Sequence, residues 1–118
     1  MKLLRFGPDR GRAIDAYGSE HVTLAPLTAP LARGASVQAA CFRLEPGGRI
    51  GRHPASVPQL LVVVAGTGWA SGADGIPHPL EHGDAVFWEA GEEHETWTED
   101  GLTAIVLEGE GVVPFHTA

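Results

Sequence analysis

Short apolar or alternating segments, separated by glycine and proline turns, make up most of this sequence. The segment 59–65 is continuously apolar after Gln59 and rich in valine, which is typical of a buried strand. Turns are expected at 45–48, 66–68 and 74–75, where glycine, proline or aspartate supply the required backbone conformations. Strands are expected at 2–6, 21–27, 36–44, 59–65, 69–71, 84–89, 95–98 and 102–108. This many short strands predicts an all-β sandwich or barrel.

Length and composition restrict the fold further. The chain has 118 residues, enough for one domain with an ordinary core. Its 16 glycines and 9 prolines are spread throughout, and the longest stretch without either is 35–45. Glycine and proline destabilise helix interiors by about 1 and about 3 kcal/mol, so a helical bundle is excluded. A hydrophobic content of 43% also argues against a disordered chain.

The net charge, the apolar runs and the cysteine content indicate which partners and which compartment to expect. The net charge is −7, and all eight basic residues lie between Lys2 and Arg52. A nucleic-acid partner is not expected, because an acidic chain without a basic cluster binds phosphates poorly. A membrane partner is not expected either, since no apolar run approaches about 20 residues and the N-terminus lacks the pattern of a signal peptide. The single cysteine, Cys41, suits a reducing compartment, so we predict a cytoplasmic protein.

Two glycine-bounded stretches carry the candidate chemistry. In the stretch 47–66, Gly47 is followed after five residues by His53, with Ala55, Gln59 and Gly66 at fixed intervals beyond it. In the stretch 83–98, Gly83 is followed by Glu89, Gly91, His94 and Thr98. The spacing resembles the two signature motifs of the cupin superfamily, although several of the motif residues differ.

The resemblance implies a double-stranded β-helix, which is a jelly-roll barrel with a site inside its mouth. In metal-binding cupins the motif histidines and glutamate hold a divalent metal. Carried over by position, His53, Gln59 and His94 occupy three of the ligand places. Ala55 occupies the fourth and has no donor atom, and Gln59 replaces an anionic carboxylate by a neutral amide.

The chemistry of these residues allows either a metal site or a metal-free pocket. Two imidazoles suit Zn, Fe, Ni or Cu, and Mn is a further candidate. Three neutral donors leave the full charge of the ion in a partly desolvated site, which favours loose binding. The alternative is a metal-free pocket in which His53, Gln59 and His94 bind a small molecule by hydrogen bonds. In that case His53 or His94 is the candidate general base.

Other residues have simpler interpretations. We expect Cys41 to be a small core residue or to line the barrel. Trp69, Trp88 and Trp97 are expected in the core or a dimer interface, with one of them as a possible ligand platform. His78 and His82 are expected in an exposed turn, and His116 near the surface. Glu92, Glu93 and Glu95 are expected in a solvated loop, unless one of them supplies a carboxylate to the site.

The prediction is therefore a single cupin domain over 1–118 that binds a small molecule. As an enzyme it would be a metal-dependent oxygenase, isomerase or lyase acting on a small oxygen-rich compound. As an alternative it would be a non-catalytic ligand-binding or sensing module without metal. Because a jelly roll has sheet edges and outer faces to protect, a twofold homodimer is also predicted.

Overall fold

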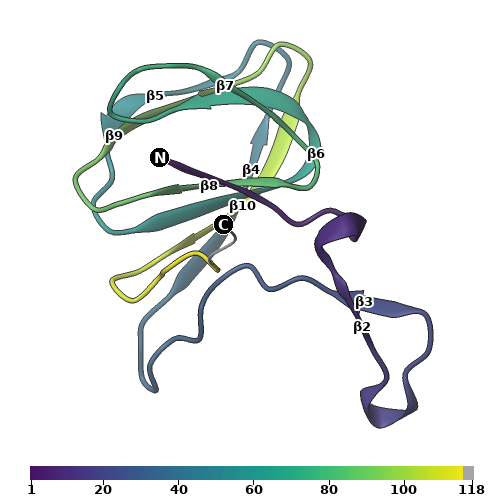
Figure 1. Ribbon diagram of the computed structural model, residues 1–118. Coiled ribbons are helices and arrows are strands. Elements are labelled where there is room, and N and C mark those ends of the chain that lie inside the picture. Colours follow the sequence, from purple (N-terminus) through teal and green to yellow (C-terminus); the bar gives the residue numbers. More distant parts are fainter. Residues whose placement is uncertain (116–118) are drawn as a thin grey trace.

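Ten β-strands and two short 3₁₀ helices form the computed structural model, which describes residues 1–115 (Figure 1). His116 lies outside the described residues. The strands are β1 (Lys2–Arg5), β2 (Arg12–Ile14), β3 (Val22–Leu24), β4 (Gln38–Leu44), β5 (Arg49–Pro54), β6 (Gln59–Ser71), β7 (His78–Glu81), β8 (Asp84–Trp88), β9 (Glu93–Trp97) and β10 (Leu102–Glu108). The helices are η1 (Pro8–Arg10) and η2 (Ala16–Gly18). No helix in this part of the chain is long and apolar enough to cross a membrane.

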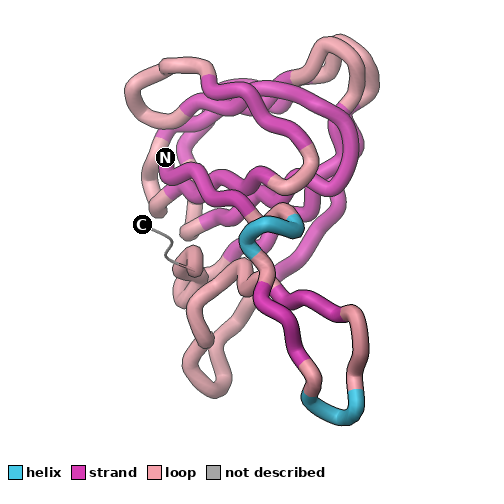
Figure 2. The backbone as a smooth tube through the Cα atoms, turned by 45° about the vertical axis from the view of Figure 1, so that its right-hand side comes forward, coloured by secondary structure: helices cyan, strands magenta, loops and turns pink. Residues whose placement is uncertain are grey.

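Antiparallel pairing arranges eight of the strands as two sheets that share β6. One sheet has the order β1–β8–β6–β10–β4. The second half of β6 leaves this sheet and pairs with β7 and β9, and β9 pairs with β5. The two sheets face each other, and Figure 2 looks along the barrel that they form. This arrangement confirms the predicted double-stranded β-helix.

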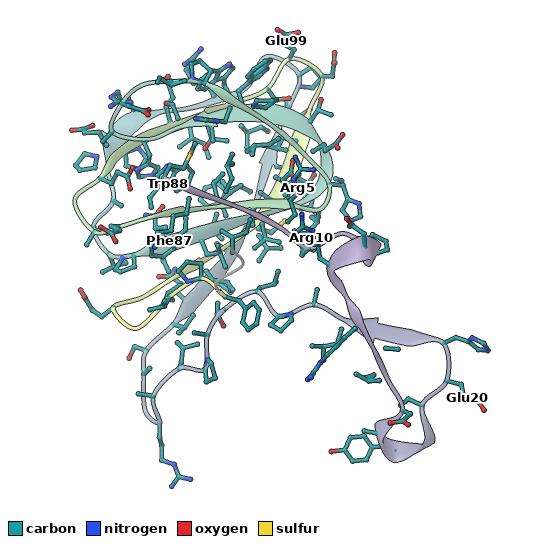
Figure 3. All side chains as sticks on the ribbon, in the orientation of Figure 1. Arg5, Arg10, Glu20, Phe87, Trp88 and Glu99 are labelled. Atoms are coloured by element: carbon teal, nitrogen blue, oxygen red, sulfur yellow. The ribbon has the colours of Figure 1, made fainter. Side chains whose placement is uncertain are left out.

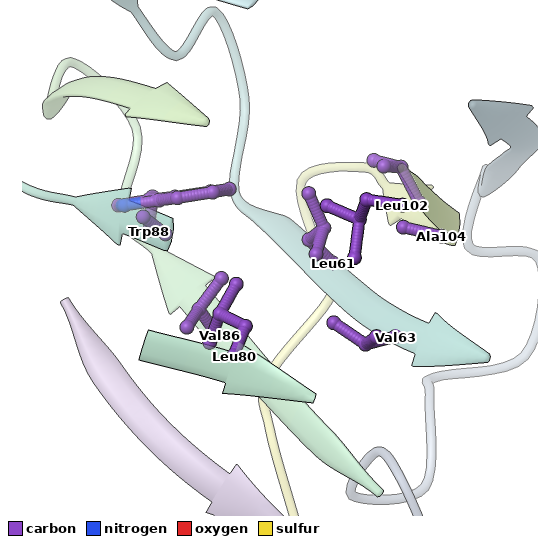
Figure 4. Packing of buried hydrophobic residues seen from close by; sticks show 9 residues of the cluster. Leu61, Val63, Leu80, Val86, Trp88, Leu102 and Ala104 are labelled. Atoms are coloured by element: carbon purple, nitrogen blue, oxygen red, sulfur yellow. The ribbon is translucent and has the colours of Figure 1, made fainter. Parts of the chain in front are cut away.

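The hydrophobic core lies on both faces of the larger sheet. Residues that alternate along β6, β8 and β10 point between the sheets and form the interior cluster (Figure 4). Leu60, Val62, Ala85 and Phe87 point the opposite way and pack with Val112 and the segment around Leu27 and Leu31. Both faces of β6 are therefore buried at 60–63, as its continuous apolar run predicts.

The structure corrects three local predictions. A turn was expected at 66–68, but β6 runs without interruption from Gln59 to Ser71. The register between β6 and β10 shifts at Val64, and Gly66 follows with a φ of +80°, so the strand bends in this stretch and continues into the other sheet. β2 and β7 lie in segments expected to be loops, because these strands have only three and four residues and leave little local signal.

Cys41 is exposed, so its predicted place in the core is wrong. It lies on β4, which among the described strands is hydrogen-bonded to β10 alone. An edge strand lacks a neighbour on one side, and both faces of β4 remain largely open. The alternation along a strand cannot distinguish an edge from the centre of a sheet.

Candidate functional site

His53 and His94 lie opposite each other on the paired strands β5 and β9. Their ring centroids are 4.4 Å apart, with the ring planes inclined at 52°. The register between the two strands shifts between Ile50 and His53, where β5 bends. Residues 41 positions apart in the sequence thus become direct neighbours in the barrel.

Backbone carbonyl groups fix the orientation of both rings. The Nδ1 atom of His53 is 2.6 Å from the Gly51 oxygen, and that of His94 is 3.0 Å from the Glu92 oxygen. Since a carbonyl oxygen only accepts, each Nδ1 carries the hydrogen and donates it. In the neutral rings both Nε2 atoms then hold lone pairs, the arrangement that suits metal ligation or proton abstraction.

His94 is the more buried of the two, with 4% of its surface exposed. Burial lowers its pKa below the ordinary histidine value, and the nearby His53 lowers it further, while the Glu92 carbonyl opposes the shift. The Trp88 ring packs against His94 with centroids 4.4 Å apart and an inclination of 33°. Trp88, labelled in Figure 3, therefore belongs both to the core and to the site.

Both imidazoles line a cavity of about 250 Å³, His94 as a buried residue and His53 as an exposed one. Its wall combines an aromatic and aliphatic part with a few polar groups. The lining residues are Gln38, Ala40, Phe42, Ile50, His53, Gln59, Leu61, Trp88, His94, Thr96, Val106 and Glu108. All three residues singled out by the motifs therefore lie along one cavity, and their roles as ligands stay a prediction.

Glu108 is a carboxylate of this cavity that sequence reasoning missed. It is directly opposite Gln38 of β4 on one side and Gln59 of β6 on the other. The three side chains form a polar row across adjacent strands, and all of them line the cavity. The period of two along β10, which places Glu108 on the same face as the buried Ala104 and Val106, was the available signal.

The acidic residues around His94 have other partners. Glu92 accepts a hydrogen bond from the Met1 ammonium group, with 2.7 Å between nitrogen and Oε2. Burial alone would raise the pKa of Glu92, but this ion pair and two backbone N–H donors bring it below its ordinary value. Glu95 pairs with Arg49, and Glu93 is exposed. Glu93 and Glu95 lie on β9 rather than in the expected loop, none of the three acids lines the cavity, and Glu108 is the carboxylate that does.

The donor set at the cavity is small. Within residues 1–115, no group of three or more histidine, cysteine, aspartate or glutamate side chains is placed to hold a metal. Ala55 is buried, with 2% of its surface exposed, and offers only a methyl group at the position where the motif has a second histidine. An ion at this site would depend on two imidazoles and the Gln59 amide.

A larger hollow, of about 450 Å³, is lined by residues that include Arg5, Trp69, Glu81 and Asp84. Neither His53 nor His94 lines this hollow, and both line the smaller cavity. His78 is half-buried on β7, and His82 is exposed beyond its end, so neither joins the pair at the site.

An antiparallel barrel of two sheets with inward-facing imidazoles defines a small double-stranded β-helix protein with an internal site. The family model described as "Cupin domain" matches residues 40–108, which is more than half of the chain. The chain belongs to the cupin family.

Relatives with known names cover only parts of the chain. It is 38% identical to an (R)-mandelonitrile lyase from Granulicella tundricola over 60 residues, 51% of this chain and 46% of that protein. The crystal structure of the DMSP lyase DddQ from Ruegeria pomeroyi has a TM-score of 0.60 and 26% identity, covering 64% of this chain and 39% of that one. The matches thus span less than half of either lyase.

A near full-length match supports the fold alone. An uncharacterized conserved protein with a double-stranded β-helix domain from Klebsiella pneumoniae has a TM-score of 0.59 at 14% identity. The match covers 92% of this chain and 93% of that protein. Because the identity is low, this match supports the barrel architecture and says nothing about the chemistry of the site.

Proposed function

We propose that this chain is a small-molecule lyase in which the His53–His94 pair moves a proton. One observation carries the proposal: both rings donate Nδ1–H to backbone carbonyls, and among the described residues neither Nε2 has a hydrogen-bond partner. Because burial lowers the pKa of His94, its Nε2 is unprotonated near neutral pH. A fixed, neutral imidazole inside a cavity has the properties of a general base.

The cavity wall suggests the kind of substrate. Phe42, Ile50 and Trp88 offer aromatic and aliphatic surface to an apolar group. Gln59 and Glu108 offer hydrogen-bond acceptors to a hydroxyl group. A compact molecule that combines an apolar substituent with a hydroxyl-bearing carbon fits this division.

The names of the two relatives favour a lyase over an oxygenase or isomerase. For an aromatic α-hydroxynitrile, the imidazole takes the hydroxyl proton, and the electron pair of the O–H bond forms the carbonyl. The carbon–carbon bond to cyanide then breaks, and cyanide receives the proton from the imidazolium. The products are an aldehyde and hydrogen cyanide, and no oxidant or reductant is needed.

If a divalent ion of the class that imidazole binds occupies this cavity, His53, His94 and Gln59 would be its ligands. The carbonyl-held Nδ1–H groups support this, because histidines that ligate metals donate their other N–H to such acceptors. When bound, such an ion would act as a Lewis acid toward an oxygen of the substrate.

Turnover of mandelonitrile tests the proposal, with release of benzaldehyde followed by its absorbance. We expect activity in the wild-type protein and a loss of about 10²-fold to 10⁴-fold in His94→Gln. The exposed His82→Gln is the matched control and should retain activity. A second series with a chelator and added Mn²⁺, Ni²⁺ or Zn²⁺ measures the dependence on metal.

A binding module without catalysis is the second candidate, favoured by Ala55 and Gln59 at two ligand positions of the motif. Under this alternative, small hydroxylated or carbonyl compounds raise the melting temperature without being converted, and a chelator has no effect. Stabilisation of the wild-type protein by mandelonitrile or benzaldehyde without turnover would replace the lyase proposal by this one.

A further inference from the structure

Glu108 is the carboxylate of the cavity that the two imidazoles line. All eight lysine and arginine residues lie between Lys2 and Arg52, and none of them lines this cavity. In the part of the chain that the structure describes, the ion pairs involve other carboxylates, and none involves Glu108. The cavity thus contains a carboxylate to which the described chain supplies no counter-ion.

The side chains beside Glu108 offer further hydrogen-bond acceptors. Four residues stand in register across neighbouring strands of the larger sheet, in the order Trp88 of β8, Gln59 of β6, Glu108 of β10 and Gln38 of β4. All four line the cavity. The two glutamines therefore flank Glu108, and each amide has a carbonyl oxygen that accepts hydrogen bonds. Glu108 and its two neighbours present three accepting groups in one row.

This set of acceptors matches a primary ammonium group. An ammonium has three N–H donors and no acceptor, so the carboxylate and the two amide oxygens can each receive one hydrogen bond. Its positive charge also offsets the negative charge of Glu108, which is half-buried. An anionic ligand would meet Glu108 as a like charge, and no lysine or arginine lines the cavity to bind it.

The same row sets the position of the ammonium relative to the imidazoles. The Trp88 ring packs against His94, and β6 lies between the strands that carry Trp88 and Glu108. Neighbouring strands in a sheet lie about 4.8 Å apart, so the backbones of Trp88 and Glu108 are separated by about 10 Å. A ligand that reaches both the imidazoles and Glu108 therefore needs a spacer. Leu61 and Val106 line the cavity beside the row and offer apolar surface to that spacer.

We propose that Glu108 determines the specificity of this site by binding a protonated amine of the ligand. The inference rests on the proposed function and names its substrate class, a hydroxylated compound whose apolar spacer ends in a primary amine. The His53–His94 pair acts on the hydroxyl group, while Glu108 and the two flanking amides hold the ammonium. Glu108 serves recognition and takes no part in the proton transfer.

Calorimetric titration with benzylamine and benzyl alcohol tests this inference, because the two compounds match in shape and differ in charge. In the wild-type protein benzylamine, which is protonated near neutral pH, should bind more tightly than benzyl alcohol by about fivefold or more. Glu108→Gln keeps the shape of the side chain and removes its charge, so the ratio should fall below about twofold. Glu110→Gln is the matched control, since Glu110 is exposed, lies outside the cavity and contributes the same charge. It should keep the wild-type ratio.

Ionic strength gives a second readout that requires no variant. Raising the salt concentration from about 0.01 M to about 1 M shortens the Debye length from about 30 Å to about 3 Å. Benzylamine should then bind the wild-type protein more weakly, whereas the affinity for benzyl alcohol should change little. A benzylamine affinity independent of salt would contradict the pairing with Glu108.

Four results of the titration would overturn the inference. They are no binding of benzylamine, equal wild-type affinities for the two compounds, a wild-type ratio that persists in Glu108→Gln, and a preference that is lost in Glu110→Gln as well. Mandelonitrile contains no amine, so its turnover is a separate measurement. Turnover without an ammonium preference would refute the role of Glu108 alone, and an ammonium preference without turnover would refute the lyase proposal alone.

Discussion

The chemistry at the scale of single residues depends on how two imidazoles are held. His53 and His94 each use Nδ1–H on a carbonyl oxygen, so their acceptor nitrogens remain available in the cavity. Trp88 covers one face of His94 and excludes water from it. Desolvation is the main cause of the low pKa of His94, so its environment keeps it in the neutral form.

The first prediction concerns pH and stability. Because the folded pKa of His94 lies below its ordinary value, 6.5, the unfolded chain takes up the proton first as pH falls. The free energy of unfolding should therefore decrease from about pH 6.5 downward, until His94 is protonated in the folded state too. His94→Gln should remove this part of the pH dependence, as measured by urea unfolding between about pH 5 and pH 8.

His82→Gln is the control for this experiment, because His82 is an exposed histidine outside the cavity. The control should keep the slope of the wild-type protein. Equal slopes for all three proteins would show that burial of His94 does not affect its protonation.

The second prediction concerns Gln59. Replacing its neutral amide by a carboxylate in Gln59→Glu offsets part of the charge of a bound ion. The affinity for Zn²⁺, Ni²⁺ or Mn²⁺ should rise by on the order of 1–3 kcal/mol, measured by calorimetric titration. Gln38→Glu is the matched control, since Gln38 also lies opposite Glu108 and lines the same cavity.

Each variant places a second carboxylate directly opposite Glu108. Such a pair of like charges costs about 0.2–1 kcal/mol in a sheet. They differ in that only position 59 is a ligand place of the motif. An equal change in metal affinity for both variants, or no change in either, would argue against Gln59 as a ligand.

At the scale of elements, β6 connects the two sheets and thereby positions the site. Its first half pairs with β8 and β10, and its second half pairs with β7 and β9. The bend falls at Gly66, close to the Gly101 carbonyl. At this point the chain needs both a left-handed backbone conformation and the absence of a side chain.

The third prediction compares Gly66, which lies in β6, with Gly75, which lies in the loop after β6. A Cβ atom on Gly66 would lie 2.2 Å from the Gly101 oxygen, whereas one on Gly75 would meet open space. Both have positive φ, of +80° and +72°, so alanine should cost about 1–2 kcal/mol at either position. Gly66→Ala should lose roughly 1–3 kcal/mol more through overpacking, as measured by chemical denaturation. Equal losses of stability in Gly66→Ala and Gly75→Ala would mean that the strand accommodates a methyl group at position 66 without strain.

At the scale of the whole molecule, the barrel is well packed but two parts remain open. The hairpin 12–24 has little packing apart from that between its own strands, and β4 has a free edge. These open parts are available to the interface of the predicted homodimer.

The fourth prediction follows from mass action. A dimer that forms only between folded chains raises their stability as the concentration rises. Each tenfold increase in protein concentration should favour the folded dimer by about 1.4 kcal/mol, so the melting temperature should increase steadily. Calorimetry over a hundredfold concentration range measures this change in melting temperature. A wild-type melting temperature independent of concentration would contradict the prediction.

The sequence by itself determined the all-β barrel and the candidate residues. Alternation and turn residues are local properties, so they predict where strands run and which side chains share a face. The motif spacing was enough to single out His53, Gln59 and His94, and the structure places all three along one cavity. The free Nε2 atoms did not follow from the sequence, because the Nδ1 contacts depend on the bend of β5 and β9.

Tertiary structure decided what depends on the neighbours of a strand. The pattern of β4 resembles that of a buried strand, yet Cys41 is exposed because β4 lies at an edge. Glu108 lines the site because β10 lies between β4 and β6, which aligns it with two glutamines distant in sequence. Strand order and register arise from long-range pairing, and burial follows from them, so a local pattern predicts the faces of a strand but not its position in the sheet.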